Sequence, residues 1–179
     1  NRIDYWYYDP FVLTEPLPVK LRIGQIPFRV GTKGVLTEKN LAMIANTSPR
    51  EIPTGLTIKI GRKANKIYLL SLNYVLAQKS YVPCVRVELR YTDGSVDERD
   101  LVNPYNFDFF GQNSGINTRE YALNPVPRHN QVYYKDTHLT MTDVLCDGSK
   151  ILAEVRFRSI ATETFFGLAG MTLNIPEGE

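Results

Sequence analysis

The chain has 179 residues, a length that suits one domain and allows a sizeable buried core without covalent or metal cross-links. Hydrophobic residues make up 43% and charged residues 22%, which excludes a disordered chain, and a formal net charge of +2 with scattered Lys and Arg argues against nucleic acid as a partner. No apolar run approaches the ~18 residues of a transmembrane helix and no signal peptide is visible, so no membrane partner is predicted.

The first candidate strands are interrupted by proline. Residues 5–13 and 26–30 have strand-like composition, but Pro10 and Pro27 place them at a sheet edge or a bulge, because proline cannot donate to a central ladder. Residues 37–45 are the best candidate for a helix. The segment is short, so a turn or a short strand fits it equally well.

The middle of the chain contains the strongest strand patterns. Apolar and polar residues alternate over 56–60 and again over 85–91, which predicts strands with one buried face. Residues 67–72 are nearly all apolar, as in a strand covered on both faces. Asp93-Gly94 follows the second alternating run directly and predicts a hairpin, because glycine tolerates positive φ.

Strand patterns continue to the C-terminus. Residues 153–157 alternate apolar and charged side chains, starting with Ala153, and residues 168–175 read as a closing strand. Asp147-Gly148 predicts a second hairpin between residues 139–145 and this alternating strand. Eleven Pro and twelve Gly separate the segments, and many short strands with turns between them favour an all-β sandwich or barrel.

Cys84 and Cys146 leave two interpretations open. Both are consistent with buried thiols, because free cysteine is among the most buried residue types. A single disulfide is the alternative in a secreted protein, although the sequence alone does not bring the two residues together. They do not belong to a cluster with the ligand spacing of a zinc site.

Residues 103–134 form an irregular segment rich in Pro, Gly, Asn and aromatic residues. Long loops of this kind are usually functional or disordered, and the aromatic content argues against disorder. A sugar site needs flat rings for apolar C–H faces and Asn, Asp, Arg or Tyr for hydroxyl edges. We therefore predict a ligand site formed by Trp6, Asn103, Tyr105, Asp108, Arg119, Tyr121, Arg128 and His129.

These assignments have structural alternatives. The run Trp6-Tyr7-Tyr8 would alternate faces on a strand, so at least one of its rings would belong to the core. Phe107 in the loop is better suited to pinning that loop onto the sandwich than to contacting a ligand. His129 fits a solvent-exposed loop position as well as a binding role.

Residues 56–71, LTIKIGRKANKIYLLS, resemble a recurring segment of galactose-binding-like jelly-roll domains. In that family a strand ending in Gly and a Lys-Ala turn precede a buried strand rich in Tyr and Leu. Residues 87–94, VELRYTDG, look like the strand and Asp-Gly hairpin that follow it. Residues 151–160 and 165–175 are similar to the paired closing strands of the family.

The resemblance follows the order of elements over residues 26–175 and the letters over 56–94. It implies one jelly-roll β-sandwich domain over residues 1–179, with 103–134 as a long loop insertion. Such domains are usually accessory modules of secreted polysaccharide-degrading enzymes; some bind glycans, and others only pack on a catalytic domain. They often carry a structural calcium, for which this sequence offers no assignable ligands, and no other cofactor is expected.

Three functions follow from this reading. The chain begins at Asn1 rather than Met, and we expect a fragment of a larger secreted or periplasmic protein. The predicted function is a non-catalytic carbohydrate-binding module, with carbohydrate and the parent protein's catalytic domain as partners. The first alternative is a structural module that packs on that catalytic domain without binding free ligand.

The second alternative is a small β-sandwich glycoside hydrolase or polysaccharide lyase. A hydrolase needs two converging carboxylates, and a lyase would need a set such as Tyr121, Arg128 and His129. The sequence contains no Gly-x-Ser-x-Gly elbow and no Gly-rich phosphate loop. Carboxylates such as Asp97 and Asp100 are plentiful, but the sequence does not show any two of them meeting.

Overall fold

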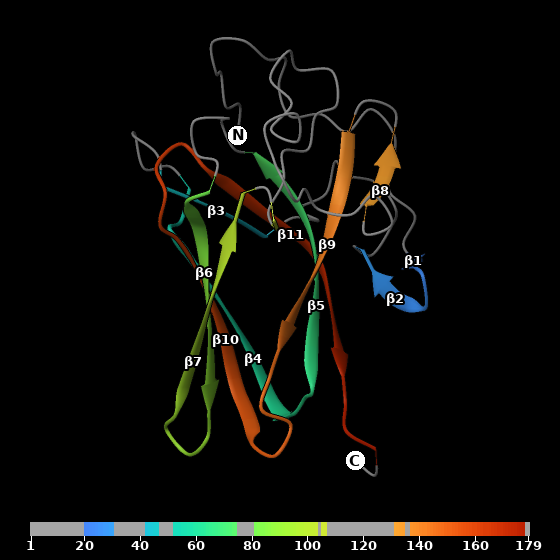
Figure 1. Cartoon of the computed structure of the whole chain (residues 1–179), viewed down its shortest axis with the longest axis vertical. Helices are drawn as coiled ribbons and strands as arrows, with labels where there is room; N and C mark the ends of the chain where they lie inside the picture. Colours follow the sequence, from blue (N-terminus) through green and yellow to red (C-terminus); the bar gives the residue numbers. More distant parts are fainter. Residues whose placement is uncertain are drawn as a thin grey trace.

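The computed structural model describes residues 20–30, 42–46, 52–74, 81–103, 105–106, 131–134 and 137–177. The strands are β1 (Lys20–Ile23), β2 (Ile26–Arg29), β3 (Ala42–Ala45), β4 (Gly55–Lys63), β5 (Lys66–Tyr74), β6 (Pro83–Tyr91), β7 (Val96–Val102), β8 (Gln131–Tyr134), β9 (Thr137–Leu145), β10 (Ile151–Ser159) and β11 (Phe165–Asn174). A four-stranded sheet has the order β4-β10-β6-β7, and a five-stranded sheet has the order β3-β11-β5-β9-β8 (Figure 1). All pairs are antiparallel, and β1 and β2 form a separate hairpin.

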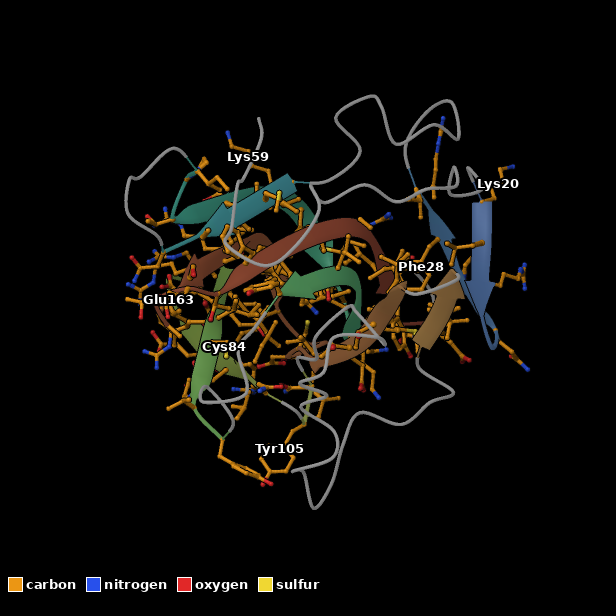
Figure 2. The ribbon with its side chains drawn as sticks, turned by 90° about the horizontal axis from the view of Figure 1, so that it is seen from above. Lys20, Phe28, Lys59, Cys84, Tyr105 and Glu163 are labelled. Atoms are coloured by element: carbon orange, nitrogen blue, oxygen red, sulfur yellow. The ribbon has the colours of Figure 1, made fainter. Side chains whose placement is uncertain are left out.

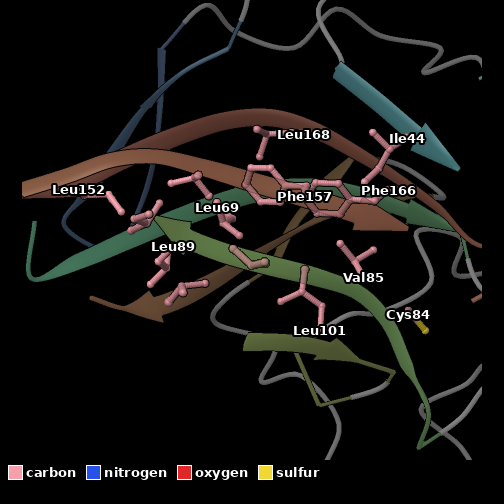
Figure 3. Close-up of a cluster of buried hydrophobic side chains, with 14 of the residues drawn as sticks. Ile44, Leu69, Cys84, Val85, Leu89, Leu101, Leu152, Phe157, Phe166 and Leu168 are labelled. Carbon is pink, nitrogen blue, oxygen red and sulfur yellow. The ribbon is translucent and has the colours of Figure 1, made fainter. Parts of the chain in front are cut away.

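The two larger sheets pack face to face around one apolar core. Val85, Val87 and Leu89 alternate inward from β6, and their neighbours on that strand include charged residues that face outward. Phe157 on β10 and Phe166 on β11 stack between the sheets, with ring centroids 5.4 Å apart (Figure 3). The chain is therefore a β-sandwich, and this prediction is confirmed.

A second apolar cluster covers the outer face of the five-stranded sheet. Leu70 and Leu72 of β5 pack there against Phe28 of the β1–β2 hairpin and against Leu139. Ile67 of the same strand points into the core between the sheets. Strand β5 is thus buried on both faces, as its continuous apolar composition predicts.

The Asp93-Gly94 hairpin is confirmed between β6 and β7. Gly94 has a φ of 87°, a value that side chains with a Cβ rarely adopt. Asp93 Oδ1 accepts hydrogen bonds from the backbone amide and the hydroxyl of Ser95 at 2.9 and 2.6 Å. These bonds stabilise the carboxylate and lower the pKa of Asp93 to about 2.

The hairpin predicted at Asp147-Gly148 is wrong. Strand β9 lies in the five-stranded sheet and β10 in the four-stranded sheet, so this turn crosses from one sheet to the other. The backbone amide of Asp147 donates to the phenolic oxygen of Tyr91 at 2.8 Å. This bond fixes the crossing turn to the end of β6. An Asp-Gly turn has the same local chemistry whether it joins two strands of one sheet or crosses between two sheets.

Two further predictions need correction or limits. Strand β10 contains a β-bulge between Leu152 and Glu154, so Leu152 is fully buried and Ala153 is not part of the core. Of the segment 37–45, the end is described and forms strand β3. Residues 5–13 lie outside the described residues.

Cys84 and Cys146 are both free thiols, which settles the open choice between thiols and a disulfide. Cys84 has no solvent exposure, and burial raises the pKa of the half-buried Cys146 to about 11. Because the thiolate is the nucleophile, this raised pKa keeps Cys146 in the unreactive thiol form at pH 8.

We expect iodoacetamide to modify neither cysteine of the folded chain within an hour at pH 8 and both within minutes in 6 M guanidinium. Intact-mass spectrometry counts the modified thiols. Rapid labelling of the folded chain at pH 8 would contradict this burial.

Candidate functional site

The sandwich interior is polar at the end where β6 begins and β7 ends, drawn at the top of Figure 1. Ile67 and Leu69 belong to the core, and the period of two along β5 puts Ser71 and Asn73 on the same inner face. Asn73 Nδ2 donates to Ser71 Oγ at 2.8 Å, and Ser71 Oγ donates to the carbonyl of Thr140 at 3.4 Å. Among the described residues no group donates to the buried Asn73 Oδ1, an acceptor that requires a partner such as ordered water.

Asn106 fixes the turn that follows β7. Its side-chain Oδ1 accepts a hydrogen bond from the backbone amide of Val102 at 2.6 Å, and its backbone amide donates to the Val102 carbonyl at 3.2 Å. Its Nδ2 donates to the carbonyl of Asp100 at 3.3 Å. Thr142 Oγ1 donates to the Asn106 carbonyl at 2.7 Å, which joins the turn to β9. These bonds hold Tyr105, the preceding residue, in a defined position.

Tyr81 and Tyr105 form an exposed aromatic pair at this end, here called the tyrosine platform. Their ring centroids are 5.6 Å apart at an interplanar angle of 63°, and each residue is 45% exposed. Figure 2, viewed onto this end, shows Tyr105 at the rim of the molecule. The rings come from segments on either side of the β6–β7 hairpin, so the hairpin brings them together.

The backbone of Tyr81 is held in a rare conformation. Its φ is 64°, in the left-handed region that bulky residues seldom enter and that costs ~1–3 kcal/mol. Its amide donates to the carbonyl of Asn103 at 2.6 Å. Such strain persists only where the surroundings enforce it, so the backbone at Tyr81 is held in place by its neighbours.

The structure describes only part of the predicted ligand site. Tyr105 belongs to the tyrosine platform, and Asn103 is fully buried beneath it, where its carbonyl holds Tyr81. The other predicted site residues lie outside the described residues: Trp6, Asp108, Arg119, Tyr121, Arg128 and His129.

Tyr81 is the site residue that the sequence analysis did not predict, because its neighbours depend on the register of β6 against β7. The Asp93-Gly94 turn fixes the register of β6 against β7, with Arg90 opposite Val96. The register then shifts by one residue between Pro83 and Val85, where Pro83 pairs with Val102 and Val85 with Leu101. Counting from the turn therefore does not assign the partner of Tyr81, and its contact with Tyr105 follows only from the folded structure.

The outer face of the four-stranded sheet carries a network of ion pairs. Glu88 is nearly buried and accepts from Arg158 at 2.8 Å and from Arg90 at 3.2 Å. Arg86 binds Asp100 through two nitrogens, at 2.9 and 3.2 Å. This face has its charges mutually compensated, which is typical of a solvated sheet surface rather than of a site for a charged ligand.

No group of three or more His, Cys, Asp or Glu side chains within the described ranges is arranged to hold a metal ion. In the same part of the chain, no helix is long and apolar enough to cross a membrane. No protein-family model matches the chain, and neither a curated protein nor a solved structure shows significant similarity to it.

Proposed function

We propose that this β-sandwich is a carbohydrate-binding accessory module, of jelly-roll topology, that belongs to a secreted or periplasmic glycan-degrading enzyme and is not itself catalytic. The tyrosine platform is the observation that carries the proposal. It presents two exposed rings in edge contact beside the segment in which the sequence predicts a sugar site.

The pairing of the strands supports the jelly-roll topology. Leaving aside the β1–β2 hairpin and the edge strand β8, the remaining strands pair in a nested order, the first with the last and so on inward. These pairs are β3–β11, β4–β10, β5–β9 and β6–β7. A jelly roll has eight strands in two sheets, and nested pairs arise when one long antiparallel hairpin is rolled up into them.

The chemistry of the platform suits a pyranose ring. The apolar C–H face of a sugar packs on an aromatic ring, while the phenolic O–H groups of tyrosine can donate to and accept from its hydroxyls. Tyr105 and Tyr81 meet at 63°, so one ring can support the face of a sugar while the other borders its edge. The contact between the two rings reduces the side-chain ordering that binding requires.

A structural role is the second candidate, and one observation favours it. Val82 is 41% exposed beside the two tyrosines, so the platform is also an apolar patch that a neighbouring domain would cover. The two roles make different predictions for the isolated chain, because a docking patch has no affinity for free glycans.

The experiment is a glycan-array screen of the isolated chain, followed by titration calorimetry with the best ligand. Tyr81→Ala and Tyr105→Ala are each expected to weaken binding about three- to tenfold, since aromatic contacts contribute ~0.5–1.5 kcal/mol. Tyr105→Phe keeps the stacking surface and is expected to retain most of the affinity.

Leu145→Ala is the matched control, because Leu145 is 59% exposed and lies at the end of β9 away from the platform. Glycan binding that survives both tyrosine variants would remove the platform from the site. If the chain is correctly folded and binds no glycan on the array, the structural role is favoured instead.

A further inference from the structure

The β1–β2 hairpin borders an open pocket of about 710 Å³ that is separate from the tyrosine platform. Strand β11 forms the opposite wall with Met171 and Thr172, and the hydroxyl of Thr172 donates to the carbonyl of Pro27. The volume lies within the ~300–1,000 Å³ typical of small-ligand sites. Figure 2 shows Lys20 on the hairpin at the edge of the molecule.

The described lining of the pocket carries three positive charges and no negative one. Lys20, Arg22 and Arg29 line it, all three are exposed, and none of them forms an ion pair within the described part of the chain. Lys20 stands directly opposite Arg29 in the hairpin ladder. Like charges in this arrangement are destabilising, so the arrangement disfavours the free hairpin and favours an anion between the two side chains.

The pocket also has apolar walls. Pro27 is exposed and Met171 is half-buried, and both line the pocket. Phe28 is only 3% exposed and anchors the hairpin on the five-stranded sheet. An added Cβ at Gly170 would lie 3.4 Å from the Phe28 ring, so the hairpin sits close to β11 and its position is well defined. A ligand that fits has anionic groups at its edge and an apolar surface of its own.

We infer that this pocket binds an anionic oligosaccharide through sulfate or carboxylate groups held by Lys20, Arg22 and Arg29. Guanidinium groups form paired hydrogen bonds with both kinds of anion, and sugar C–H faces suit the apolar wall. The choice of a saccharide as the carrier of the anions rests on the proposed function. The site itself does not depend on the tyrosine platform.

The test measures affinities of the full chain at 50 mM NaCl by titration calorimetry. The probes are a sulfated heparin-derived tetrasaccharide, a tetragalacturonate and the neutral cellotetraose, with a single-stranded oligonucleotide as a competitor. We expect one of the two anionic tetrasaccharides to bind, with Arg22→Gln and Arg29→Gln each weakening that binding about tenfold. The preferred probe identifies sulfate or carboxylate as the recognised group.

Lys59→Gln is the matched control, because Lys59 is an exposed cation on β4, in the other sheet. It is expected to leave the affinity unchanged within twofold. Since the substituted cations are exposed, unchanged thermal unfolding confirms that each variant is folded.

The inference is overturned if neither anionic tetrasaccharide binds, if both arginine variants bind like the original chain, or if Lys59→Gln weakens binding equally. Competition by the oligonucleotide at equal concentration would also overturn it, in favour of nucleic acid. Anionic binding lost in the arginine variants supports the inference even where neutral glycans never bind and the platform fails its own test.

Discussion

Replacement of Phe157 by alanine is expected to lower the free energy of unfolding by about 3–5 kcal/mol. Phe157 and Phe166 come from opposing sheets, are fully buried and stack on each other at an interplanar angle of 21°. Truncation leaves a cavity between the sheets that the surrounding strands cannot close completely. At ~2–4 °C per kcal/mol for a chain of this size, Tm is expected to fall by about 10 °C in thermal unfolding followed by circular dichroism.

Val96→Ala provides the comparison for this result. Val96 is 44% exposed on β7, and its truncation is expected to change stability by no more than about 0.5 kcal/mol. Phe166→Ala is expected to lower the free energy of unfolding by as much as Phe157→Ala. The double variant is expected to lose less than the sum of the two single variants, because either single change already removes the contact between the rings. A loss below about 1 kcal/mol for Phe157→Ala would show that the sheets do not pack through this pair.

Features that depend on neighbouring residues were predictable from the sequence. The Asp93-Gly94 hairpin follows from one dipeptide beside an alternating strand, and its strands are adjacent in the chain. The burial of both faces of β5 follows from its uninterrupted apolar run between residues 67 and 72. In both cases the determining signal is contained within a few positions of the element.

Features that depend on strands distant in the sequence were not predictable from it. The turn at Asp147-Gly148 has the same local chemistry as the β6–β7 turn, yet it joins strands of different sheets. The difference is decided by the long-range pairs of β9 with β5 and of β10 with β4 and β6. The bulge in β10 buries Leu152 where the alternating pattern predicts Ala153. It likewise depends on the pairing with neighbouring strands and not on the pattern of β10 itself.

The candidate site shows the same division. Aromatic and amide residues near the end of β7 marked Tyr105 and Asn103 from composition alone. Tyr81, by contrast, becomes a partner only through the register of the hairpin and the Tyr81–Asn103 backbone bond. The basic pocket requires the β1–β2 hairpin to dock on β11, and residues 20–23 carry too short a pattern to predict that strand.

Replacement of Glu88 by alanine is expected to lower the free energy of unfolding by about 2 kcal/mol. Its carboxylate is only 8% exposed and lies between Arg90 of its own strand and Arg158 of β10. Without it, Arg158 loses its partner at 2.8 Å, and Arg90 keeps Glu154 at the longer distance of 4.0 Å. Breaking a buried pair typically costs ~3–5 kcal/mol, and the half-exposed arginines reduce that value because water can solvate them. Urea denaturation measures the difference.

Glu98→Ala is the matched control on the same face. Glu98 binds Arg86 at 2.9 Å but is 49% exposed, so its loss is expected to cost no more than about 0.5 kcal/mol. Raising the salt to 1 M shortens the Debye length to ~3 Å and is expected to remove the effect of Glu98 while leaving most of that of Glu88. Equal losses for the two variants would mean that Glu88 is no more than a surface charge. A larger, salt-resistant loss at Glu88 would identify this carboxylate as the link between β6 and β10 on a face that the apolar core does not reach.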